Sequence, residues 1–142
     1  MQLYDLAYEL SYRADLQIIV LRWLRPSGIA ESQESYEAAF ALARQHRCGR
    51  WLLDGRRRGI VDLALTKWLA DYFFTEVGQH LLPKQLKLGV LTSPDRQNQI
   101  SADAVLAAEI ARALAPGPLS YQTYVGLNEG QVLDWLLTES SR

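Results

Sequence analysis

The sequence predicts an α/β fold, a single domain with a mixed, mostly parallel five-stranded sheet flanked by helices. Two strand-like segments open the chain and lie close enough to form an antiparallel hairpin. Helix-like and strand-like segments then alternate, which is typical of a parallel sheet. The length of 142 residues and the 49% share of apolar residues suit one hydrophobic core. We therefore expect the order β-β-α-β-α-β-α-β-α over residues 1–142.

The opening hairpin rests on two patterns. Tyr8, Leu10 and Tyr12 alternate with polar residues, as in a strand with one buried face. The stretch 16–24 is β-branched and almost continuously apolar, which favours an interior strand.

A first helix is expected over 31–46, with Tyr36, Phe40 and Ala43 on its buried face. Cys48-Gly49 should end it, since glycine adopts the left-handed capping conformation easily. The third strand follows over 50–54. Its Trp51 is expected in the core, and would mark an interface if it faced outward.

The second helix has the strongest periodicity in the chain. Its apolar residues recur at helical spacing and predict one face that packs on the sheet. Pro83 ends this pattern. The inward residues should be Leu65, Trp68, Leu69, Tyr72, Phe73 and Val77.

The remaining elements follow from apolar runs and capping residues. A fourth strand is expected over 86–91 and a fifth over 119–125, after a stop at residues 116–118. Ser101 should cap a third helix, and Asn128 with Gln131 resembles a capping box for the last. The inward residues of these helices should be Val105, Leu106, Ile110 and Leu114, then Val132, Leu133, Leu136 and Leu137.

Composition narrows the class of protein. A net charge of −1 argues against general attraction to nucleic acid or to membranes. Cys48 is the only cysteine, so no intrachain disulfide forms and a reducing compartment is expected. The first residues lack a signal-peptide pattern, and no apolar run approaches the about 20 residues of a membrane span. These features predict a cytoplasmic protein.

Patterns for catalysis or metal binding are missing from the sequence. His46 and Cys48 are close, but His80 lies far away and no second ligand cluster accompanies them. There is no nucleophile elbow and no glycine-rich phosphate loop. The sequence therefore predicts no enzyme activity, no metal and no cofactor.

The segment Asp54-Gly55-Arg56-Arg57-Arg58 is the best candidate for a binding site. It follows a buried strand, and ligands of α/β proteins bind at the carboxyl ends of strands. Thr92, Ser93 and Arg96 follow the next strand and should lie nearby. Asp54 is expected to cap the turn or to pair with an arginine. The other arginines would bind an acidic partner or a small anion, or would only be solvated.

The element order resembles the STAS domain, the fold of bacterial SpoIIAA-like anti-sigma factor antagonists. The chain is similar to small bacterial STAS-like proteins in its aromatic opening hairpin and in the segments 51–58, 68–69 and 134–136. True antagonists have Asp-Ser-Ser/Thr-Gly after the third strand, and a partner kinase phosphorylates the hydroxyl residue. Here Gly55 and Arg56 follow Asp54, so the phosphorylation switch is not carried over.

The resemblance implies a non-enzymatic regulatory module for protein–protein interaction. Its partner would dock on the third-strand loop and the following helix. The alternative hypothesis is a sensor that holds a small anion or ligand near Asp54, residues 56–58 and residues 92–96. An enzyme is the third and weakest hypothesis, and a homodimer is left open.

Overall fold

The computed structural model describes residues 7–59, 62–115 and 121–138. Within them, a five-stranded sheet has the order β1-β2-β3-β4-β5. The first strand pairs antiparallel with the second, and all other neighbours are parallel. The expected α/β class, the mixed five-stranded sheet and the interior position of the second strand are confirmed. The strands are β1 (Tyr8–Arg13), β2 (Ile18–Trp23), β3 (Arg50–Asp54), β4 (Leu86–Leu91) and β5 (Tyr121–Gly126).

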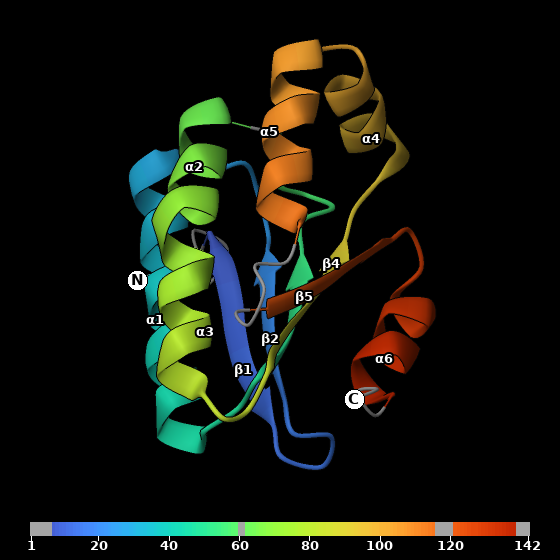
Figure 1. Cartoon of the computed structure of the whole chain (residues 1–142). Coiled ribbons are helices and arrows are strands. Elements are labelled where there is room, and N and C mark those ends of the chain that lie inside the picture. Colours follow the sequence, from blue (N-terminus) through green and yellow to red (C-terminus); the bar gives the residue numbers. More distant parts are fainter. Residues whose placement is uncertain (1–6, 60–61, 116–120, 139–142) are drawn as a thin grey trace.

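Helices cover the two faces of the sheet unequally (Figure 1). One face carries α1 (Ile29–His46) and a long helix made of α2 (Leu63–Trp68), a π-helical turn η2 (Leu69–Phe73) and α3 (Phe74–Leu81). On the other face, the described part of the chain places only α6 (Glu129–Leu137), which contacts β3, β4 and β5. At the carboxyl ends of the parallel strands lie α4 (Pro94–Ser101) and α5 (Ala104–Leu114).

Alternation along the strands divides the core into two parts. In β2, Ile19, Leu21 and Trp23 pack toward α1 and α3, in a cluster rich in aromatic rings. Ile18 and Val20 belong to a smaller cluster with Val132 and Leu136 of α6. The near-continuous apolar run of β2 is therefore explained by burial on both faces.

Lys87 of β4 joins the sheet to the end of α6. Lys87 is buried, and a buried ammonium group requires hydrogen-bond acceptors. Its Nζ finds them in the carbonyls of Trp135 and Thr138, to which it donates at 2.9 Å each. These are carbonyls of the last helical turn, which a cation satisfies well. Burial, with the nearby charge of Arg50, lowers the pKa of Lys87.

The π-helical turn corrects the predicted face of the second helix. Leu65, Leu69, Phe73 and Val77 are buried as expected, and Trp68 is half-buried. Tyr72, expected inward, is 52% exposed, and Phe74 is buried instead. The prediction assumed α-helical spacing throughout, whereas a π turn holds an extra residue and rotates the face that follows it.

The end of the first helix also differs from the prediction. Arg47, with φ 51°, occupies the left-handed position that was expected of Gly49. Gly49 meets a different requirement, because a Cβ there would lie 2.5 Å from the carbonyl oxygen of Gln85. Close approach of the chain before β4 therefore explains this glycine.

Trp51 is fully buried, so it belongs to the core and marks no interface.

The segment after β4 forms two helices where one was expected. Ser93 caps α4 and Asp103 caps α5, whereas Ser101, the predicted cap, is the last residue of α4. Val105 and Leu137, both expected inward, are exposed. Asn128 caps α6 by accepting from the Gln131 N–H, as predicted. Residues 116–120, which include the predicted stop and the start of the fifth strand, lie outside the described residues.

Candidate functional site

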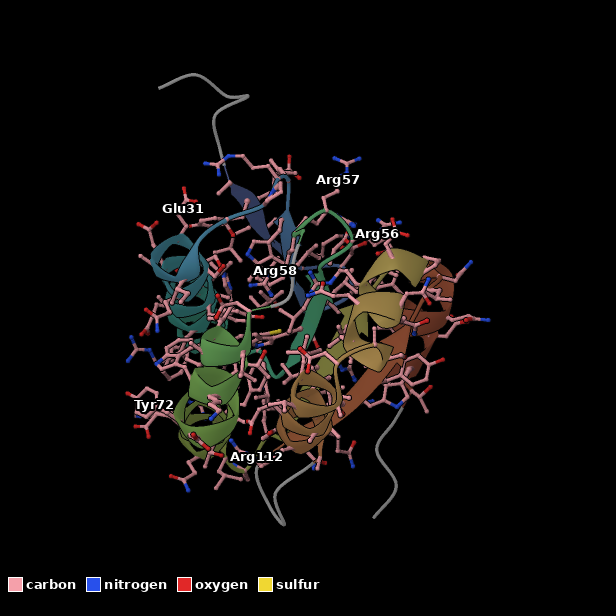
Figure 2. The ribbon with its side chains drawn as sticks, turned by 90° about the horizontal axis from the view of Figure 1, so that it is seen from above. Glu31, Arg56, Arg57, Arg58, Tyr72 and Arg112 are labelled. Carbon is pink, nitrogen blue, oxygen red and sulfur yellow. The ribbon has the colours of Figure 1, made fainter. Side chains whose placement is uncertain are left out.

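The three consecutive arginines after β3 point in different directions (Figure 2). The strand ends beside β4, because the Gly55 N–H donates to the Leu91 carbonyl at 2.9 Å. A turn follows, closed by the Arg58 N–H on the Gly55 carbonyl. Arg56 extends to one side, Arg57 points away from the helices, and Arg58 lies between α1 and α4. The loop therefore serves two separate environments.

The first environment is an ion network centred on Asp54. Its carboxylate accepts from the backbone N–H and the side chain of Arg56, so it both caps the turn and pairs with an arginine, as predicted. Arg22 of β2 also donates to it, at 2.8 Å. Arg22 in turn makes two 2.8 Å bonds to Glu129 at the start of α6.

The network holds its carboxylates in the charged form. Burial alone would raise the pKa of Asp54, but the hydrogen bonds from Arg56 and Arg22 outweigh it and keep the pKa below its usual value. The bond from Arg22 lowers the pKa of Glu129 in the same way. These four side chains compensate one another and join β2, the loop and α6. Their role is therefore structural: Asp54 is buried, and the charge of Arg56, although its side chain is 44% exposed, is already balanced by Asp54.

The second environment is built around Arg58. Its guanidinium carbon lies 4.1 Å from the centre of the Trp23 ring, a cation–π contact. Its two terminal nitrogens donate to the Tyr36 hydroxyl and to Ser32, both at 3.1 Å. All these partners are neutral. The side chain is therefore held firmly in place without a carboxylate.

Arg58 lines a cavity of about 460 Å³ at the carboxyl ends of the parallel strands. Polar lining residues come from α1 and the turn before it, from the β3 loop, from the start of α2 and from α4, while most of the wall area is apolar. The cavity lies where α/β proteins commonly bind ligands. The apolar wall includes Leu65, Leu69, Phe74, Ile110, Leu114 and Val125.

Arg96, in the first turn of α4, is the second cation in the cavity wall. Its Nη1 donates to the Gly59 carbonyl at 2.7 Å. Burial, and then repulsion from Arg58, lower the pKa of Arg96 to about 10. It remains protonated at neutral pH. Within the described residues, neither Arg58 nor Arg96 forms an ion pair with a carboxylate.

The only acidic residue among the described lining residues is Asp62. Its carboxylate is engaged at the start of α2, where it accepts from the Leu65 N–H at 2.9 Å. The start of α1 also lines the cavity, with Ser27, Gly28 and Ile29. The N-cap residue of this helix is Gly28, which has no side chain to accept from the first backbone N–H groups. Helix N-termini attract negative charge. The polar part of the cavity is thus suited to an anion.

The structure separates the predicted site residues into groups. Arg58, Thr92, and Arg96 line the cavity, whereas Asp54 and Arg56 belong to the ion network. Arg57 is exposed, and Ser93 caps α4 by accepting from the Arg96 N–H at 3.3 Å.

Sequence analysis missed several residues of both environments. Trp23, Ser32 and Tyr36 hold Arg58, and Arg22 and Glu129 complete the network. Arg22 did carry a signal, because it is the one charged residue in the otherwise apolar run of β2. A buried or half-buried charge requires a partner.

The residues considered for metal or thiol chemistry lie apart from this site. His46 stacks on Tyr12, with ring centres 3.9 Å apart, and His80 lies beside Glu76. Cys48 is buried, its thiol donates to the Gln17 carbonyl, and burial raises its pKa. In the part of the chain that the structure describes, no three potential metal ligands cluster together.

Comparison with protein-family models, curated proteins and solved structures finds no significant match for this chain. Of the described helices, none combines the length and the apolar character that a membrane crossing requires.

Proposed function

We propose that the protein is a non-enzymatic regulatory module that binds a small organic anion in the cavity lined by Arg58 and Arg96. One observation carries the proposal. Two guanidinium groups face a largely apolar cavity, and within the described residues neither has a carboxylate partner. A partly desolvated cation without a counter-charge is unfavourable, so an anion that enters gains both attraction and hydrogen bonds.

The wall of the cavity argues for an organic ligand. A free inorganic ion would leave the leucine, isoleucine and phenylalanine side chains of α2, α3 and α5 in contact with water. The volume of about 460 Å³ lies within the usual range for small-molecule sites. An elongated molecule with an anionic group and an apolar body would fill both parts of the cavity.

Octyl sulfate, titrated calorimetrically below its micelle-forming concentration, tests this proposal. We expect one molecule to bind per chain, and replacement of Arg96 by methionine to weaken binding at least about tenfold, as for loss of a charge-assisted contact. Arg57→Met is the matched control, because it removes the same charge from the same surface but outside the cavity, and should leave affinity unchanged. Absence of saturable binding, or equal loss in both variants, would contradict the proposal.

We also propose that the chain is STAS-like. The observed order supports this, with an antiparallel hairpin followed by three parallel strands, each reached through a helical connection, and a closing helix. The third connection consists of two helices, α4 and α5. In this proposal the loop after β3 is the functional loop, as the resemblance implies.

A second candidate function is docking of an acidic partner protein on that loop. Arg57 supports it, because within the described residues this exposed side chain forms no hydrogen bond or ion pair. Replacing Arg57 by alanine should change the free energy of unfolding by less than about 1 kcal/mol, as for exposed charges. It should weaken partner capture, and added salt should do the same to the wild-type protein. Capture that is unaffected by both changes would rule out docking through Arg57.

A further inference from the structure

We propose that the ligand is an organic phosphate monoester, with a doubly charged headgroup held between Arg58 and Arg96 and an apolar body against α2, α3 and α5. This inference rests on the proposed function and specifies the chemistry of its ligand. It follows from the number of cations in the cavity wall and from how few of their hydrogen-bond donors the protein itself uses.

The charges of the cavity favour a dianion over a monoanion. Each guanidinium brings one positive charge to the cavity wall, and a singly charged headgroup would leave one of them without compensation. Asp62 contributes one negative charge to the wall, but its carboxylate caps the N-terminus of α2, where the helix dipole offsets it.

The unused donors point to the same headgroup. Arg58 gives one N–H to Tyr36 and one to Ser32, and Arg96 gives one to Gly59. Since each guanidinium carries a fork of N–H groups, most donors of the pair have no acceptor among the described residues and can serve a ligand. A phosphate monoester has more acceptor oxygens than a carboxylate, and above its second pKa of about 6 it carries two charges. Thr92, also in the wall, adds a hydroxyl group.

Octyl phosphate and octyl sulfate form a matched pair for the test, because they share a chain and a tetrahedral headgroup but differ in charge. At pH 8 octyl phosphate is a dianion, and we expect it to bind about tenfold more tightly than octyl sulfate. At pH 5 it is a monoanion, so the ratio should approach one. Tyr36 and Asp62 are the other ionisable side chains in the described wall, and at a given pH both ligands meet them in the same form.

Two variants make the test specific. Arg96→Met should abolish the preference for phosphate at pH 8, because one guanidinium is left to match one charge. Asp62→Asn retains a side chain that can cap α2, and it should strengthen octyl phosphate binding more than octyl sulfate binding. Thermal unfolding of each variant would show that it is folded. A preference for phosphate that survives Arg96→Met would place the headgroup elsewhere.

The outcomes separate this inference from the proposed function. Equal affinities at pH 8 would contradict the dianion and leave an organic-anion site standing. Binding of neither ligand would contradict both. Inorganic phosphate binding as tightly as octyl phosphate would exclude any contribution of the apolar wall and so contradict the monoester.

Discussion

Replacing Phe73 by alanine should lower the free energy of unfolding by about 3–5 kcal/mol, the range for removing a fully buried aromatic ring. Phe73 is 1% exposed and lies at the centre of the aromatic cluster between the sheet and the helices. Its ring centre is 4.9 Å from Trp68 and 5.5 Å from Tyr36. Because rings from α1, α2, α3 and β3 surround it, the space left by the truncation cannot close easily. Urea unfolding followed by circular dichroism measures the change.

Tyr72→Ala is the control for this prediction. The two residues are adjacent and aromatic, but Tyr72 is 52% exposed, so its truncation should change stability by less than about 1 kcal/mol. A regular α-helix with the predicted face would bury both rings. Similar losses in the two variants would therefore contradict the π-helical turn.

Replacing Asp54 by alanine should lower the free energy of unfolding by about 2–4 kcal/mol. This is somewhat less than the loss expected when one partner of a fully buried ion pair is removed, because Arg22 and Arg56 are partly exposed. The change removes the acceptor that caps the turn and leaves two cations facing each other beside a single carboxylate, Glu129. Arg56→Ala, which removes only an exposed partner, is the matched control and should cost less than about 1 kcal/mol. Equal losses of stability in Asp54→Ala and Arg56→Ala would contradict the role of Asp54 as the centre of the ion network.

The same network predicts the pH dependence of stability. Asp54 and Glu129 have pKa values below those of the unfolded chain, so each contributes stability above its unfolded pKa. That contribution is lost as the pH falls through the folded pKa. Between about pH 5 and pH 2, the wild-type protein should therefore lose more stability than Asp54→Asn. Parallel curves for the two proteins would contradict the lowered pKa of Asp54.

The fold was largely predictable because its determinants are local. Alternation in 8–13, the continuous apolar run of β2 and the proline and cap residues each constrain their own segment. Their order then predicts a hairpin joined to a parallel sheet, as observed. The wrong predictions concern segments whose local sequence pattern is compatible with more than one helical structure. An extra residue in a π turn exposes Tyr72, and a second cap at Asp103 divides one expected helix into two.

The candidate site shows what the sequence determined and what only the tertiary structure decided. By sequence alone, the acid and the arginines after a buried strand predicted that a ligand or partner would bind at this edge of the sheet. The chain order placed the loop of β4 beside it. Sequence could not assign the arginines to their environments, because that depends on which distant side chains reach the loop. Arg22 and Glu129 draw Arg56 into the ion network, while Trp23 and Tyr36 hold Arg58 in the cavity. Packing of α1, α2, and α5 creates that cavity, and no local pattern encodes an empty volume.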